Sequence, residues 1–139
     1  MEKDKEAPSV RFVGVIRSPF ASRAETPKQE TEGGAEVVLE IFPEFRDALD
    51  GLSPGREIVV LTWLHLSGRE ALRVHPRGNA SAPLRGVFAT RSPDRPNPIG
   101  LHQAKILAIS EDGRLTIAPM DVLDETPVVD IKPALRPEK

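Results

Sequence analysis

Prolines are spread along the whole chain, and they limit the possible folds more than any other feature of the sequence. Fourteen prolines and ten glycines occur in 139 residues. Each proline restricts its own φ angle and removes a backbone hydrogen-bond donor, and glycines favour turns. The sequence therefore predicts many turns, short strands and few long helices.

Short apolar runs between the turn residues are typical of β-strands. The run REIVVLTWLHLS (56–67) is apolar on both faces and rich in β-branched residues, which predicts a central strand with His65 as a core histidine. Trp63 and the five phenylalanines are interleaved with apolar residues and are also expected in the core. Further strands are expected at 9–18, 37–42, 71–75, 84–90, 100–110 and 115–120.

The sequence also predicts the connections between these runs. Residues 111–114 (EDGR) predict an Asp-Gly hairpin turn, and Pro43 and Gly51 bound one short helix. Residues 121–139 are expected as short extended pieces broken by prolines. Together the elements predict an all-β fold: a small closed or nearly closed β-barrel with one short helix and long loops. One domain is expected at 9–135, between flexible tails at 1–8 and 136–139.

The composition excludes several classes of function. The chain has no cysteine, which removes disulfides, thiolate zinc sites and thiol nucleophiles. Glycine-rich nucleotide-binding motifs are absent from the sequence, and its three histidines lack the spacing of metal ligands, so no metal is expected. We expect a soluble, cytoplasmic protein, since the sequence shows neither a signal peptide nor an apolar run of membrane-spanning length.

Charge is unevenly distributed along the chain. Residues 25–57 carry nine acidic and three basic residues, whereas residues 69–95 carry six arginines and two acidic residues. Arginine suits bidentate recognition of phosphate or carboxylate, although a solvated surface would carry the same charges. The same region contains FATRSPDRPNPIG (88–100), whose prolines would form either a stiff connector or a rigid support for ligand-binding arginines.

Four motifs then occur in an order that resembles the TsaA-like, or TrmO, family. They are IRSPF (16–20), TPKQ (26–29), GVFATRSPDRPNPIGL (86–101) and DETPVVDIKP (124–133). The resemblance covers roughly residues 10–135. It implies a dimeric β-barrel that binds S-adenosylmethionine near the subunit interface and methylates N6 of threonylcarbamoyl-adenosine beside the anticodon of tRNA.

The implied reaction leads to hypotheses for substrate-binding and catalytic residues, and the resemblance implies cofactor-binding residues by motif position. Arg91 and Arg95 are expected to bind the carboxylate or phosphates of the substrate. Asp130 is a candidate general base, with pairing to Lys132 as the structural alternative. The cofactor-binding residues are expected to be Pro27, Lys28, Gln29, His65, Leu66, Arg91, Leu101, Asp124, Glu125, Thr126 and Pro127.

Three positions depart from the family pattern. Lys28 stands in place of arginine, Glu125 in place of a turn glycine that permits positive φ, and Ala134 in place of tyrosine. Two alternatives to tRNA methylation are open, and the loss of the tyrosine motivates the first of them. One is a barrel that binds S-adenosylmethionine or RNA without catalysis, and the other is a methyltransferase for another substrate.

Overall fold

The computed structural model describes residues 7–20 and 35–135 and contains eight β-strands in this part of the chain. The three helical segments of the described residues are all short 3₁₀ helices, including the helix expected after Pro43. In chain order the elements are β1 (Gly14–Arg17), β2 (Ala35–Ile41), η3 (Pro43–Leu49), β3 (Glu57–Trp63), β4 (Arg73–Val74), η4 (Pro76–Gly78), β5 (Arg85–Gly86), η5 (Val87–Ala89), β6 (Ile99–Ile109), β7 (Arg114–Met120) and β8 (Pro127–Pro133).

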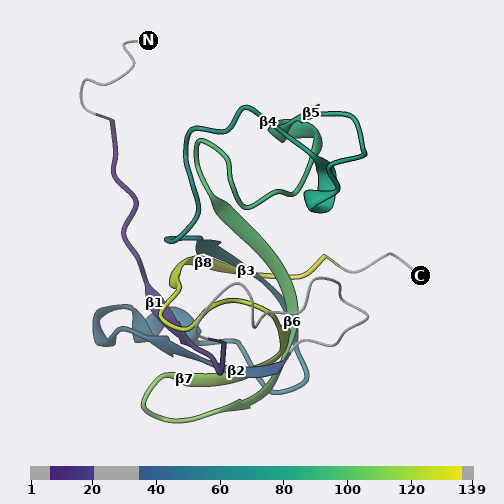
Figure 1. Ribbon diagram of the computed structural model, residues 1–139. Helices are drawn as coiled ribbons and strands as arrows, with labels where there is room; N and C mark the ends of the chain where they lie inside the picture. Colours follow the sequence, from purple (N-terminus) through teal and green to yellow (C-terminus); the bar gives the residue numbers. More distant parts are fainter. Residues whose placement is uncertain (1–6, 21–34, 136–139) are drawn as a thin grey trace.

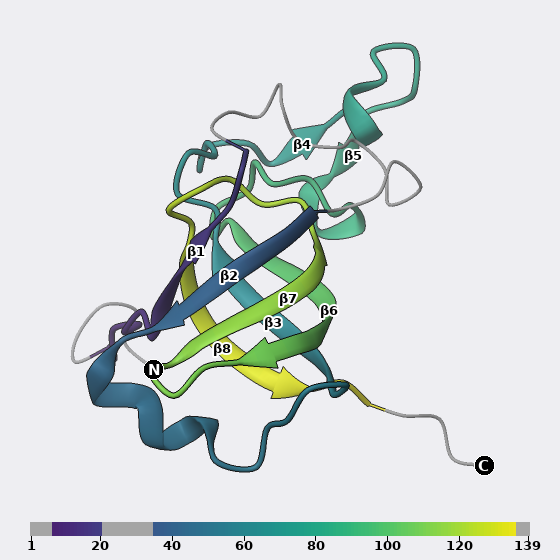
Figure 2. The same cartoon turned by 90° about the horizontal axis from the view of Figure 1, so that it is seen from below.

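Six of these strands form a closed antiparallel barrel in the order β1-β2-β7-β6-β3-β8 (Figures 1 and 2). The expected fold class is therefore confirmed. Closure matters physically because it leaves no unpaired sheet edge in the barrel wall. An extended piece lies between Pro127 and Pro133, as expected, but its role was not predicted: it is a seven-residue strand, β8, that pairs with both β1 and β3 and closes the barrel.

Alternating side chains of the six strands fill the barrel. On β3, for example, Ile58, Val60 and Thr62 point inward and are completely buried. Complete burial of one large aliphatic side chain is worth about 1.5–3 kcal/mol, so this interior is the main source of stability. The apolar core consists of Ile16, Val37, Leu39, Ile41, Ile58, Val60, Ala104, Ile106, Leu115, Ile117, Met120, Val122 and Val128.

Aromatic residues contribute less to this interior than the sequence suggests. Phe88 is 88% exposed and Phe12 is 39% exposed, while Phe45 only packs against the edge of the core. His65 is also exposed, because β3 ends at Trp63 and His65 lies in the turn that follows. The placement of these residues in the core was therefore wrong for Phe12, Phe88 and His65.

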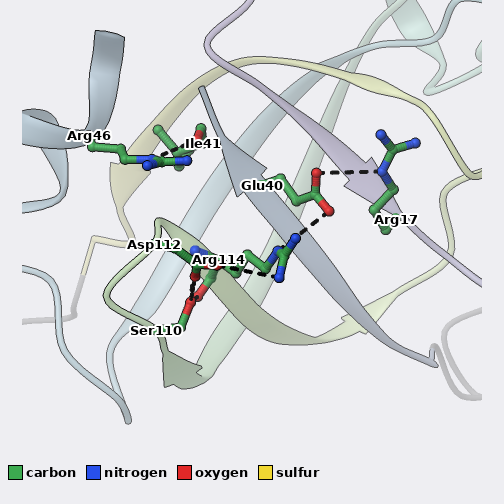
Figure 3. A network of polar contacts seen from close by, with 7 residues as sticks. All are labelled: Arg17, Glu40, Ile41, Arg46, Ser110, Asp112 and Arg114. Atoms are coloured by element: carbon green, nitrogen blue, oxygen red, sulfur yellow. Dashed lines mark hydrogen bonds and ion pairs between the residues drawn. The ribbon is translucent and has the colours of Figure 1, made fainter. Parts of the chain in front are cut away.

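The hairpin turn expected at 111–114 joins β6 to β7, and Gly113 adopts a φ of 82° there. Figure 3 shows the polar network beside this turn, in which Glu40 of β2 lies between two arginines. Its carboxylate is 3.6 Å from Arg17 and 3.7 Å from Arg114, and Arg114 is also 3.4 Å from Asp112. These ion pairs lie on the outer wall of the barrel, where each contributes at most about 1 kcal/mol.

Residues 64–98, which we call the arm, leave the barrel between β3 and β6. The arm contains the small two-stranded sheet β4–β5 and projects beyond one end of the barrel (Figures 1 and 2). Helix η3 lies at the opposite end in Figure 2. Among the described residues, no helix is long and apolar enough to cross a membrane.

Candidate functional site

A cleft of about 1490 Å³ lies between the arm and the adjacent end of the barrel. Its wall consists mainly of residues from the arm, from β6 and from the loop that leads from β7 to β8. They are 64–67, 73–76 and 88–94 of the arm, His102 of β6, and 121–123 and 126 of the loop. The barrel places these segments together because β3 ends, β6 begins and β8 begins at this same end of the antiparallel wall.

A pair of polar residues on β3 and β6 lies at the base of this region. The Thr62 Oγ1 and His102 Nε2 atoms are 2.8 Å apart and form a hydrogen bond across the two strands. Gly100 makes this pairing possible, since a Cβ atom at that position would lie 2.6 Å from His102 Nε2 and closer still to Thr62 Oγ1. The glycine thus leaves room for a histidine to contact a fully buried threonine.

The electrostatic environment keeps His102 uncharged at neutral pH. Burial lowers the pKa of its imidazole below the ordinary value, and the negative charge of Asp121 partly opposes this effect. Both side chains line the cleft. A neutral imidazole can accept a proton, so the cleft contains a group suited to general-base chemistry.

The loop before β8 is held in place by the segment that follows β1. Ser18 donates its backbone N–H to Asp124 Oδ1 (2.9 Å) and its hydroxyl to the carbonyl of Val122 (2.7 Å). The backbone N–H of Asp124 donates to the carbonyl of Phe20 (2.7 Å). Asp124 therefore fixes the loop rather than facing the cleft, of whose lining it is not a part.

The next two residues of this loop have different roles. Glu125 has a φ of 67°, which is the left-handed conformation that a glycine would adopt more easily at this position. Its backbone N–H donates to the carbonyl of Ile16 (2.8 Å), and its carboxylate lies 3.7 Å from Arg17. Thr126 is buried, lines the cleft, and donates its hydroxyl to the carbonyl of Leu123 (2.7 Å). The loop thus combines a strained turn with a cleft-lining threonine.

The proline segment is both a connector and a support for cations. Its Arg95 uses Nη1 to donate to the carbonyls of Thr90 (3.0 Å) and Ser92 (3.1 Å), so this guanidinium holds the segment together. Arg69 fastens the segment to the preceding turn by donating to the carbonyl of Pro96 (2.7 Å) and to Asn97 Oδ1 (2.9 Å). Arg91, in contrast, is exposed on the cleft and has no side-chain partner among the described residues.

The structure thus brings four of the expected site residues to one cleft: His65, Leu66, Arg91 and Thr126. Leu101 is 57% exposed on the outer face of β6, and Pro127 begins β8; neither lines the cleft. Pro27, Lys28 and Gln29 lie outside the described residues.

Asp130 lies toward the other end of the barrel. It lines a separate hollow of about 340 Å³ beside η3. Its Oδ1 accepts a hydrogen bond from the backbone N–H of Ile131 (2.9 Å), and its Oδ2 lies 3.6 Å from Lys132 Nζ. The pairing with Lys132 that was the structural alternative is therefore present.

Most of the other cleft residues were not predicted as site residues from the sequence, and Phe88, His102 and Asp121 are examples. A signal for His102 was available, because strand alternation puts it on the same side of β6 as the buried Ala104 and Ile106. No comparable pattern marks Phe88 or Asp121, since their positions depend on how the arm and the loop before β8 fold back over the barrel end.

Comparison with protein families gives one match that covers most of the chain. The model of the tRNA-methyltransferase O N-terminal domain matches residues 15–137. A probable S-adenosyl-L-methionine-binding protein of Methanothermobacter thermautotrophicus is 48% identical over 124 residues, which are 89% of this chain and 88% of that protein. An S-adenosyl-L-methionine-binding protein of Archaeoglobus fulgidus is 43% identical over 120 residues, covering 86% and 84% of the two chains.

Solved structures of TrmO proteins also match this chain. The crystal structure of TrmO from Pseudomonas aeruginosa is 33% identical and superposes with a TM-score of 0.73 over 95% of this chain. The match covers 58% of the TrmO chain, so this protein spans little more than half the length of that relative.

Proposed function

The chain belongs to the family of the tRNA-methyltransferase O N-terminal domain, and from this premise we propose that it transfers a methyl group from S-adenosylmethionine to tRNA. The names of the archaeal relatives support the cofactor, and the solved TrmO structures support the substrate class. We extend the proposal to N6 of threonylcarbamoyl-adenosine as the acceptor, beside the anticodon, and to a cytoplasmic homodimer, as the sequence resemblance implies.

The observation that carries this proposal is the size of the cleft between the arm and the adjacent end of the barrel, which we call the arm-end cleft. Pockets for a single small ligand usually measure about 300–1,000 Å³. At about 1490 Å³, this cleft has room for a cofactor and for one nucleotide of a larger substrate at the same time. Methyl transfer requires that arrangement, because donor and acceptor must meet in line within one site.

The residues that line the cleft fit S-adenosylmethionine chemically. Leu66 and Val122 provide apolar contacts for an adenine ring, and the free guanidinium of Arg91 fits a carboxylate. Asp121 provides a negative charge for the ammonium or sulfonium group. We propose that Asp124 and Glu125 contribute indirectly by fixing the loop that carries Asp121 and Thr126.

When bound, S-adenosylmethionine would supply an electrophilic methyl group, with its sulfur as the leaving group. The acceptor nitrogen would have to lose its proton on taking up this methyl group. Positioning of the two reactants contributes about 7–11 kcal/mol toward lowering such a barrier. We propose that the fixed proline segment and the loop at 121–126, which both contribute lining residues to the cleft, provide this positioning.

We propose that His102 accepts the proton. It lines the cleft, is held at Nε2 by Thr62, and stays neutral at physiological pH because burial lowers its pKa. Asp130, the candidate from the sequence, lies beside the separate hollow near η3 and is paired with Lys132. The geometry therefore favours His102 over Asp130 as the general base.

Mass spectrometry of tRNA nucleosides tests the proposed function. Unmethylated tRNA is incubated with the protein and with S-adenosylmethionine that carries a trideuterated methyl group. We expect the label on threonylcarbamoyl-adenosine, and we expect the His102→Gln variant to transfer it much more slowly.

The names of the archaeal relatives, which mention binding alone, favour a non-catalytic S-adenosylmethionine-binding barrel as a second candidate. Cofactor binding is therefore measured in parallel, as the rise in melting temperature that a ligand specific for the native state produces. A clear rise without any labelled nucleoside would identify a binding protein. A label on another nucleoside would identify a methyltransferase with a different acceptor.

A further inference from the structure

The arm exposes an unusual amount of apolar surface beside the cleft. Phe88 is 88% exposed, Leu72 70%, Leu66 61% and Leu84 46%. Phe88, Leu66 and Leu84 line the cleft. Single exposed apolar residues are ordinary, but a group of them around one cleft marks a surface that contacts another molecule.

The backbone fixes the position of Phe88. Its neighbour Val87 is buried, and the Val87 N–H donates to the carbonyl of Leu72 (2.9 Å). Thr90 donates both its N–H and its hydroxyl to the carbonyl of Val87, each at 3.1 Å. The aromatic ring is therefore presented to solvent from an anchored turn, which reduces the ordering that a ligand would have to impose.

The charge around Phe88 indicates the chemistry of the ligand. Residues 69–95 carry six arginines and two acidic residues, although the whole chain has a net charge of −2. Arg73 and Arg91 line the same cleft as Phe88, and neither side chain has a hydrogen-bond or ion-pair partner among the described residues. Unpaired guanidinium groups beside an exposed aromatic ring suit a ligand with phosphates and flat rings.

RNA complements the charge of this surface, because its phosphates are negatively charged and the Arg73 side chain lacks a hydrogen-bond or ion-pair partner among the described residues. Bases in single-stranded loops are free to stack on aromatic side chains, whereas bases within a duplex are already stacked on both faces.

We propose that Phe88 is a stacking residue for an unpaired base of the RNA substrate, with Arg73 binding a flanking phosphate. This inference rests on the proposed function, because it assigns the RNA-binding part of the same cleft. It also reverses the sequence-based expectation that the phenylalanines belong to the core.

RNA binding by Phe88 variants tests the inference separately from methyl transfer. Fluorescence anisotropy with an anticodon stem-loop RNA gives the dissociation constant, and a fully paired duplex of equal length is the charge-matched control RNA. Loss of one base–aromatic stack weakens binding about 5- to 150-fold. We expect that loss for Phe88→Ala and Phe88→Leu, and near wild-type binding for Phe88→Trp. Leu107→Ala, an exposed leucine on the outer face of β6, is the matched control and should bind normally.

The possible results separate this inference from the proposed function. If the wild-type protein methylates tRNA while Phe88→Ala binds the stem-loop as tightly as wild type, the inference fails and the function stands. If stem-loop binding depends on Phe88 but no methyl group is transferred, the inference stands and the function fails. Equal binding of duplex and stem-loop, no RNA binding by the wild type, or a changed oligomeric state of Phe88→Ala would overturn the inference.

Discussion

The barrel and the arm are stabilised in different ways. The barrel is closed by six paired strands around an apolar interior. The arm has two strands of two residues each, and its proline segment is held largely by side chains, especially Arg69 and Arg95. The comparison suggests that the barrel provides stability and the arm provides binding groups. Each region can then be changed with limited effect on the function of the other.

The largest expected effect comes from the barrel interior. Ile58→Ala removes a completely buried side chain and should lower the free energy of unfolding by about 2–5 kcal/mol. Urea denaturation measures this change. Because the arm has no comparable core, it should lose its structure in the same transition. Leu107→Ala, an exposed leucine on β6, is the control and should have little effect. An arm that stays protected after the barrel unfolds would contradict the comparison.

The next largest effect is expected on catalysis, at His102 in the cleft where the arm meets the barrel. His102→Gln can keep a hydrogen bond to Thr62 but cannot act as a base, so kcat should fall about 100-fold or more. In the wild type the base must be neutral. Because burial lowers the pKa of His102, activity should fall only at a pH below the ordinary histidine value of 6.5. The pH profile of kcat measures this, and an unchanged kcat in His102→Gln would exclude the role.

The free energy of unfolding should also depend on pH through the titration of His102. Below pH 6.5 the unfolded chain gains a proton at His102 before the folded chain does, so stability falls as the pH is lowered through this value. The His102→Gln variant should lack this part of the pH dependence of stability. Melting temperatures of both proteins between about pH 7.5 and 5.5 measure the difference. Parallel curves would show that His102 is not kept neutral by the fold.

The barrel and the arm also differ in how well the sequence predicted them. The β3 strand and the 111–114 hairpin were found because apolar residues on both faces of a strand and an Asp-Gly turn are local sequence patterns. Closure by β8 was missed because its prolines fall at the two ends of the strand, Pro127 and Pro133, where they do not interrupt the ladder.

The candidate site was predicted only in part, for a physical reason. The family motifs identified Arg91 and Thr126, which line the cleft, but not the neighbours that long-range folding brings to them. Arg95 illustrates the difficulty: its charge is the same as that of Arg91, yet it bonds to carbonyls of its own segment. Which arginine is free depends on the turn geometry, and no local pattern encodes this.

A smaller effect is expected from loosening the arm alone. Arg69→Ala removes the hydrogen bonds to Pro96 and Asn97 and the contact with the ring of Trp63, 5.1 Å away. Global stability should fall by only about 1 kcal/mol, while amide hydrogen exchange at Asp94, Arg95 and Asn97 becomes faster. Arg85→Ala makes the same charge change on the arm and is the control. Equal acceleration of exchange in the barrel strands would contradict the separation of the two regions.

The smallest effect is expected at the opposite end of the barrel. Asp130→Asn removes an exposed ion pair with Lys132 and keeps an oxygen that can accept from Ile131 N–H. Such pairs contribute at most about 1 kcal/mol, and we expect kcat to stay within about twofold of wild type. Steady-state methyl-transfer kinetics test this. A loss approaching 100-fold would instead support Asp130 as the base.

Hydrogen exchange with and without S-adenosylmethionine tests the central claim, the assignment of the cofactor to the arm-end cleft, most directly. We expect added protection of the backbone at 64–67, 88–94 and 121–126, the segments that contribute lining residues to this cleft. The hollow beside η3 and its lining at 49–52 and 130–133 should exchange as before. Protection concentrated around η3, with none at the arm, would contradict the account.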